Sequence, residues 1–96
     1  MSGTLSSDGL DARRRKLLFR SWHRGIREMD LILGRFADRH LPQLSDAELD
    51  GYERLIEVAD PVLYGWISGE AAVPAEFDSP LLRRLQSFHL DVRDTT

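Results

Sequence analysis

Residues 24–30 read Arg-Gly-Ile-Arg-Glu-Met-Asp and lie between two amphipathic helical patterns. A reversal of the chain is therefore predicted here, with one helix on each side of it. Two Arg, one Gly and two carboxylates within seven residues are hard to explain by core packing alone, because charged side chains are rarely buried. We call this stretch the charged corner, and it is the first candidate for a functional surface.

Two structural roles for the charged corner are open. Gly25 can end the preceding helix as a left-handed residue, because Gly adopts that conformation without a Cβ penalty. Alternatively, Gly25 can cap the following helix, with Glu28 reaching back toward its amide. Glu28 and Asp30 would both suit the positive N-terminal end of that helix. The functional alternative is that the corner presents Arg24, Arg27 and Glu28 to a partner.

The helix before the corner is predicted over about residues 10–23, with its apolar residues on one side: Leu10, Leu17, Leu18 and Trp22. Residues 13–27 carry seven Arg or Lys and no acid, whereas the residues after them carry six Arg or Lys and fourteen acids. One end of the molecule is therefore expected to be positive. A basic amphipathic helix can bind nucleic acid, a membrane surface or an acidic protein. It can equally be a helix with solvated Arg.

The helix after the corner is predicted over about residues 26–40, because apolar residues recur there at steps of three and four. The residues of this stripe are Ile26, Met29, Leu33, Phe36 and His40. Gly34 within the pattern is expected where another helix crosses closely. Pro42 is expected to end the helix, because it disfavours helical geometry at the residue before it.

Three further helices are predicted from their start signals. Residues 45–48 form a Ser-Asp-Ala-Glu capping box. Asp60 is expected to cap the fourth helix ahead of Pro61, with Gly69 closing it, and the Ser-Pro pair at 79–80 repeats that signal. The buried face of the third helix is expected to consist of Leu49, Tyr52, Leu55, Ile56 and Ala59. The apolar residues of the fourth helix are Val62, Leu63, Tyr64, Trp66 and Ile67, of which Trp66 is expected to be largely buried. Those of the fifth helix are Leu81, Leu82, Leu85, Phe88 and Val92. No strand pattern is found, so the predicted fold class is all-α, a small bundle of five short helices.

Length and composition predict one helical domain at residues 10–92, with flexible tails at residues 1–9 and 93–96. The chain has no Cys, which excludes disulfides and thiolate metal sites. No apolar run approaches the ~20 residues of a membrane span. A phosphate-binding Gly-rich loop is missing, and the three His show no metal-ligand spacing. The sequence therefore predicts a binding module rather than an enzyme, with no catalytic residues and no metal site.

The run Arg24-Gly25-Ile26-Arg27-Glu28 matches the R-G-x-x-E motif of the succinate dehydrogenase assembly factor 2 family, small helical proteins also called flavinators. Its context RSWHRGIREMDLILGRF, residues 20–36, resembles the bacterial members. A second similarity covers residues 60–66, where the family commonly has Asp at the position of Val62. The resemblance extends over roughly residues 13–90.

This resemblance implies a helper that promotes covalent attachment of FAD to the flavoprotein subunit of succinate dehydrogenase, and in some bacteria of fumarate reductase. It implies that the charged corner faces that subunit, with partner-binding residues His23, Arg24, Gly25, Arg27, Glu28 and Asp30. We expect no stably bound cofactor, no bound nucleic acid, no membrane insertion and a monomer when free. The expected location is the bacterial cytoplasm, or the mitochondrial matrix for a processed eukaryotic form. The alternative is a helical interaction module or basic-helix nucleic-acid binder with an unrelated partner.

Overall fold

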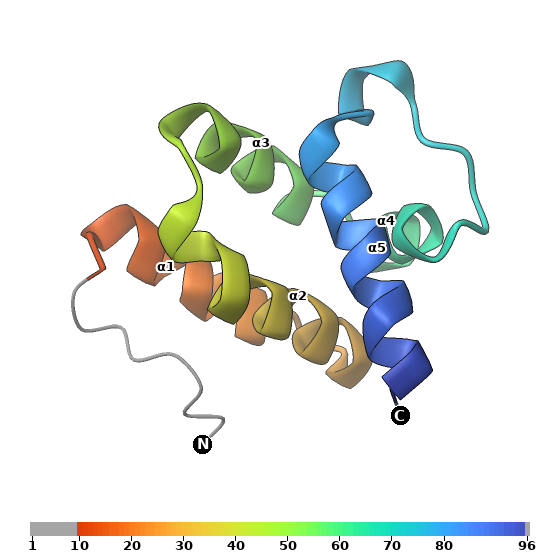
Figure 1. The fold of residues 1–96 in the computed structure, drawn as a ribbon, viewed down its shortest axis with the longest axis horizontal. Helices are drawn as coiled ribbons and strands as arrows, with labels where there is room; N and C mark the ends of the chain where they lie inside the picture. Colours follow the sequence, from red (N-terminus) through yellow and green to blue (C-terminus); the bar gives the residue numbers. More distant parts are fainter. Residues whose placement is uncertain (1–9, 96) are drawn as a thin grey trace. The chain divides into compact units, whose positions relative to one another are not determined.

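A computed structural model of the protein describes residues 10–95, with the side chains of residues 10–91 (Figure 1). Within that range it contains five α-helices, two 3-10 turns and no strand, which confirms the all-α prediction. The elements are α1 (Ala12–Trp22), α2 (Arg27–His40), η1 (Leu41–Gln43), α3 (Asp46–Ile56), α4 (Asp60–Ser68), η2 (Ala75–Phe77) and α5 (Pro80–Thr95). The tail predicted at residues 1–9 lies outside the described residues.

The chain divides into two compact units, an N-terminal unit of residues 1–49 and a C-terminal unit of residues 50–96. The described part of the N-terminal unit holds α1, α2, η1 and the first turn of α3. The C-terminal unit holds the rest of α3, then α4, η2 and α5. The single domain at residues 10–92 stays a prediction. Helix α5 continues to Thr95, past the predicted limit of that domain.

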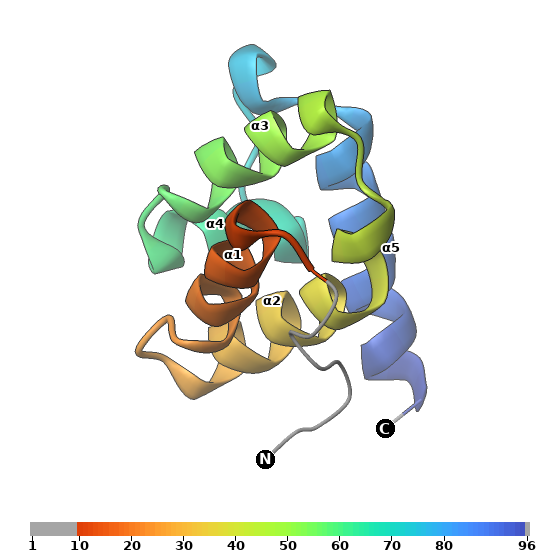
Figure 2. The same ribbon diagram turned by 90° about the vertical axis from the view of Figure 1, so that its left-hand side faces the viewer.

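In the N-terminal unit, α1 and α2 pack side by side as a helical hairpin (Figures 1 and 2). The ring of Trp22 lies against the backbone of Gly34, where a Cβ atom would stand 2.2 Å from the Trp22 Cδ2 atom. The Trp22 Nε1 atom also donates a hydrogen bond to the Asp38 Oδ1 atom at 3.2 Å. The close crossing predicted at Gly34 is therefore confirmed. Two residues of α2 hold the Trp22 side chain: Gly34 contacts its ring, and Asp38 accepts its hydrogen bond.

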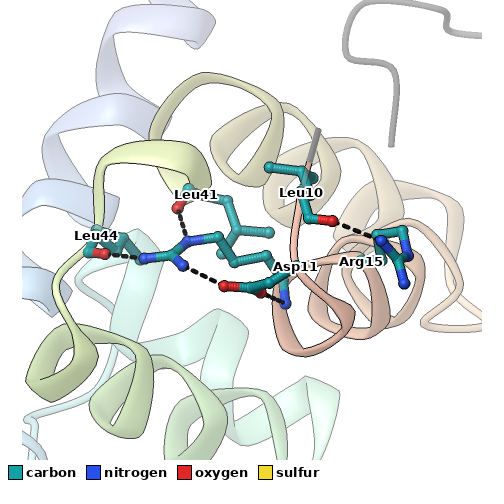
Figure 3. A network of polar contacts seen from close by, with 6 residues as sticks. Leu10, Asp11, Arg15, Leu41 and Leu44 are labelled. Atoms are coloured by element: carbon teal, nitrogen blue, oxygen red, sulfur yellow. Dashed lines mark hydrogen bonds and ion pairs between the residues drawn. The ribbon is translucent and has the colours of Figure 1, made fainter. Parts of the chain in front are cut away.

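A second contact of the N-terminal unit joins the start of α1 to the end of α2 (Figure 3). Asp11 caps α1 by accepting from the Arg14 backbone N–H at 2.8 Å and from the Arg14 Nη1 atom at 2.7 Å. The Arg14 guanidinium also donates from Nε to the Leu41 carbonyl at 3.0 Å and from Nη2 to the Leu44 carbonyl. Carbonyls at the C-terminal end of a helix lack partners within that helix. The planar Arg14 guanidinium donates to two such carbonyls at and after the end of α2.

In the C-terminal unit, Trp66 is only 6% exposed, which confirms the burial expected for it. Its ring centroid lies 5.0 Å from that of Phe77, and the Arg54 guanidinium carbon lies 5.1 Å from the Phe77 centroid. The Gln86 Nε2 atom donates to the Trp66 carbonyl at 2.9 Å, which ties α5 to α4. Phe77 of η2 therefore contacts α4 through the Trp66 ring and α3 through the Arg54 guanidinium.

The predicted capping box of α3 is confirmed. The Glu48 backbone N–H donates to Ser45 Oγ at 3.1 Å, and the Ser45 backbone N–H donates to Glu48 Oε1 at 2.9 Å. Ser79 caps α5 as predicted, with its Oγ accepting from the Leu82 backbone N–H at 3.2 Å. Gly69 closes α4 with a φ of +84°, also as predicted.

The start of α4 differs from the prediction. Asp60 is the first residue of the helix rather than its cap, and Ala59 occupies the cap without a side-chain hydrogen bond. Pro61 fits this register because the first turn of a helix tolerates a missing N–H. Helix α3 ends at Ile56, so Ala59 is exposed instead of lying on the buried face of α3. The side chain of Val92 lies outside the described residues.

Candidate functional site

The charged corner forms the connection between α1 and α2 (Figure 2). Helix α1 ends at Trp22 with His23 as its C-cap, and α2 begins at Arg27 with Ile26 as its N-cap. All six sequence-predicted partner-binding residues lie in this connection or in the first turn of α2. The connection spans only residues 23–26, and behind it the Trp22 ring lies against Gly34 of α2.

Gly25 has a φ of +99°, and no atom lies within 4 Å of the position that a Cβ would take. The positive φ predicted for it is confirmed, and backbone conformation rather than space explains the Gly. Its predicted role of ending the preceding helix is wrong, because α1 ends at Trp22 with His23 as its C-cap. The alternative that Gly25 caps α2 is wrong, because Ile26 is the N-cap and makes no side-chain cap bond. Glu28 is consequently the second residue of α2, one position short of the capping-box partner.

Asp30 supplies the internal support of the charged corner. Its Oδ1 atom accepts a hydrogen bond from the Arg24 backbone N–H at 2.5 Å, and its own backbone N–H donates to the Ile26 carbonyl at 2.9 Å. Asp30 is half-buried and lies in the first turn of α2, where a carboxylate is favoured by the helix dipole. The structure therefore gives Asp30 a role in fixing the corner, while its role in partner binding stays a prediction.

The rest of the corner is open to solvent. Gly25, Ile26, Arg27 and Glu28 are exposed, and Arg24 is half-buried. Ile26 was predicted to lie on the buried stripe of α2 but is 47% exposed, because its backbone is extended and the helical stripe begins only at Met29. The corner thus presents a cation, a carboxylate and an apolar side chain within three consecutive residues.

Sequence reasoning missed Phe19, which is 62% exposed in the last turns of α1. Its ring stacks on that of His23, with centroids 3.9 Å apart and planes 17° apart. The His23 Nδ1 atom is hydrogen-bonded to the Phe19 carbonyl at 2.7 Å. The available signal was an aromatic residue on the face of α1 away from Leu17 and Leu18.

Two carboxyl groups of the N-terminal unit have shifted pKa values, and both belong to its framework. Burial raises the pKa of Asp38 from its ordinary value of 3.8, although the hydrogen bond from Trp22 acts in the opposite direction. The backbone hydrogen bond from Arg14 lowers the pKa of Asp11. Neither group lies in the charged corner: Asp38 accepts the hydrogen bond from Trp22, and Asp11 caps α1.

The chemistry available at the corner is that of recognition. Within the described residues, no group of three or more His, Asp or Glu is arranged to hold a metal ion. No helix in that part of the chain is long and apolar enough to cross a membrane. An exposed reversal with opposite charges and apolar side chains offers hydrogen bonds, ion pairs and hydrophobic contact to another macromolecule.

Comparison with known proteins places the chain in a family. The family described as "Flavinator of succinate dehydrogenase" matches residues 15–89. The FAD assembly factor SdhE of Acetobacter pasteurianus is 38% identical over 81 residues, which are 84% of this chain and 74% of that protein. The mitochondrial succinate dehydrogenase assembly factor 2 of Dictyostelium discoideum is 40% identical over 73 residues, 76% of this chain and 52% of that protein.

A second mitochondrial succinate dehydrogenase assembly factor 2, from Meyerozyma guilliermondii, is 39% identical over 80 residues, 79% of this chain and 59% of that protein. The chain thus spans little more than half the length of these two mitochondrial relatives and about three quarters of the bacterial one. The family match covers both units and includes the whole charged corner. The chain belongs to the family of succinate dehydrogenase flavinators.

Proposed function

We propose that this protein is an assembly factor that binds the flavoprotein subunit of succinate dehydrogenase and promotes covalent attachment of FAD to that subunit. Family membership and the names of the bacterial and mitochondrial relatives support this function. They do not favour the nucleic-acid alternative. The single structural observation that carries the proposal is the exposed charged corner on a fixed helical hairpin.

The fixed geometry of the hairpin makes the corner suitable for recognition. Trp22 is packed on Gly34 and hydrogen-bonded to Asp38, so the two helices are held close behind the corner. Asp30 holds the backbone of Arg24 from the other side of the connection. A preorganised surface loses less conformational entropy when a partner binds, and more of the contact energy is retained as affinity.

The charged side chains of the corner determine the kind of contact it makes. Arg24 and Arg27 pair with carboxylates or backbone carbonyls of the flavoprotein subunit, since guanidinium groups make strong charge-assisted hydrogen bonds. Glu28 pairs with a cation of that subunit. Gly25 lacks a side chain at the turn, and a partner backbone can approach it closely.

The protein acts as a helper rather than as an enzyme in this proposal. It binds one conformation of the flavoprotein subunit more tightly than the others and so raises the population in which the subunit's own His and the flavin are correctly placed. It supplies no catalytic residue and holds no FAD of its own after purification. It is a monomer when free and works in the bacterial cytoplasm, or in the mitochondrial matrix in a eukaryotic cell.

Deletion and rescue in the native host test this function. Cells that lack the chain are expected to accumulate a flavoprotein subunit without covalent flavin, seen as lost flavin fluorescence of the denatured subunit in a gel. Re-expression restores the fluorescence, and the tagged protein co-purifies with the subunit. Normal fluorescence in the deletion strain, with no co-purification, would refute the proposal. Flavin absorbance of the purified protein after gel filtration would refute the absence of bound FAD.

A further inference from the structure

The outward face of α1 forms a second surface beside the charged corner. Lys16, Phe19, Arg20 and His23 are spaced so that they share one face of a helix with 3.6 residues per turn. We call these four residues the α1 platform. The buried residues of α1 lie on the opposite side, and they are Leu17, Leu18 and Ser21.

The centre of the α1 platform is an ordered aromatic pair. Phe19 is 62% exposed, yet its ring is stacked on His23, and His23 is hydrogen-bonded to the Phe19 carbonyl. A single exposed apolar residue needs no explanation. Here, however, two of the four large apolar side chains exposed among the described residues belong to the same hairpin: Phe19 lies in the last turn of α1, and Ile26 lies in the connection that follows it. Exposed rings with a fixed orientation are typical anchors of protein interfaces.

The rim of the α1 platform is cationic. Lys16 is exposed and Arg20 is half-exposed, and neither makes an ion pair with a described residue. Arg14 on the same helix differs, because its guanidinium is occupied by Asp11 and two carbonyls. No acid occurs between residues 13 and 27 to neutralise this face. The platform therefore combines an apolar centre with an uncompensated positive rim, which is the composition of an interface patch.

We propose that the α1 platform is a second docking surface for the flavoprotein subunit and that it binds an acidic segment of that subunit carrying an apolar or aromatic side chain. The inference rests on the proposed function and extends the interface along α1, beyond the R-G-x-x-E motif. The positive rim selects carboxylates and increases the rate of encounter with them. The Phe19–His23 pair provides a hydrophobic contact that requires little further ordering.

Binding of the purified full-length protein to the purified flavoprotein subunit of the host's succinate dehydrogenase tests the α1 platform. Phe19→Ala is expected to weaken binding about tenfold. The double variant Lys16→Glu, Arg20→Glu is expected to slow association and to flatten its dependence on salt concentration. Leu90→Ala, which removes another exposed apolar side chain, is the control for the first change. Arg35→Glu, at an exposed site of α2, is the control for the second and is expected to bind normally.

The outcomes separate this inference from the proposed function. If the wild-type protein binds the subunit and both platform variants bind it equally well, the inference is overturned and the proposed function stays intact. Absence of wild-type binding would overturn both. If Phe19→Ala does not fold, the charge-reversed variant decides, because its substitutions lie on the solvent face. Loss of affinity for a single-stranded RNA probe, with binding to the flavoprotein subunit unchanged, would identify the platform as a nucleic-acid surface and contradict the assignment.

Discussion

Gly34 and Gly51 both lie within helices, but only Gly51 has room for a side chain. A Cβ at Gly34 would stand 2.2 to 2.5 Å from three ring atoms of Trp22. At Gly51 the nearest atom, Leu81 Cδ2, is 3.7 Å away, an ordinary contact distance. The same substitution should therefore have opposite effects on stability at the two positions.

Gly34→Ala is expected to destabilise the protein by ~1–3 kcal/mol, because the indole must leave its packed position and its hydrogen bond to Asp38. Gly51→Ala is expected to stabilise it by ~0.5–1 kcal/mol, since Ala has the higher helix propensity. Urea denaturation of both variants measures the free energy of unfolding. A Gly34→Ala protein as stable as the wild type would show that Trp22 is not confined by α2.

Asp38 gives the N-terminal unit a predicted pH dependence. Its folded pKa is raised by burial, so the stability it contributes is fully present below the ordinary value of 3.8 and is lost as pH rises through the folded pKa. Asp38→Asn keeps an oxygen to accept from Trp22 but cannot ionise. The variant's melting temperature relative to the wild type is therefore expected to increase between about pH 3.5 and about pH 7.

The control for this experiment is Asp91→Asn, which removes one negative charge from an exposed position of α5. A melting-temperature difference for Asp38→Asn that stays constant with pH, or that follows the control, would contradict burial as the cause of the Asp38 shift.

Among the helices, the start of α1 depends on one side chain, Arg14, which reaches the Leu41 and Leu44 carbonyls and Asp11 together. Arg14→Lys keeps the charge but not the planar fork. We expect a loss of ~1–3 kcal/mol, because two partly buried carbonyls lose charge-assisted partners. Arg20→Lys on the same helix is the control, and chemical denaturation is the measurement. Equal stability of the two variants would show that the Arg14 network contributes little.

Contacts that are local in sequence were predictable, and distant ones were not. The Ser45–Glu48 box and the Ser79 cap join residues three positions apart, so the sequence pattern specifies both partners. Arg14 finds carbonyls 27 and 30 residues away, which no local pattern can indicate. Asp60 was wrongly predicted as the cap of α4 because Pro61 suits the first and the second helical position alike.

In the candidate site, too, some features could be predicted from the sequence and others could not. The R-G-x-x-E motif marked the charged corner, and the positive φ of Gly25 followed from residue type. The contact between Asp30 and the Arg24 amide was not predictable, because it depends on where α2 begins. The exposure of Ile26 depends on that boundary as well. Phe19 could not be identified from the sequence as part of a surface, because single exposed apolar residues are common and carry no functional signal of their own.

At the scale of the whole molecule, the basic residues between 13 and 27 fall into two groups: some bind groups of the protein itself, and others make no ion pair within the described residues. Of the basic residues between 13 and 27, Arg14 and Arg15 are used inside the N-terminal unit, in bonds to backbone carbonyls. Lys16, Arg20 and Arg27 make no ion pair within the described residues and remain available to a partner. Such a surface suits binding to an acidic protein.

Glu28→Gln distinguishes a charged corner that acts on a partner from one that only shapes a helix end. Glu28 is exposed at the second position of α2, and Gln keeps its size while removing its charge. A role limited to the helix dipole would cost at most ~1 kcal/mol of stability and leave flavin attachment normal. Loss of an interfacial ion pair would weaken binding by ~2–5 kcal/mol with the fold intact.

The measurement is in-gel flavin fluorescence of the succinate dehydrogenase flavoprotein subunit, in cells whose only copy of the protein is the variant at native expression. Thermal melting of the purified variant accompanies it, and Arg35→Ala, further along α2, is the control. We predict that the free energy of unfolding of Glu28→Gln lies within ~1 kcal/mol of the wild-type value. The variant nevertheless fails to restore the flavin signal, while Arg35→Ala restores it fully. Full flavin attachment with a folded Glu28→Gln protein would show that the Glu28 charge has no role in partner binding.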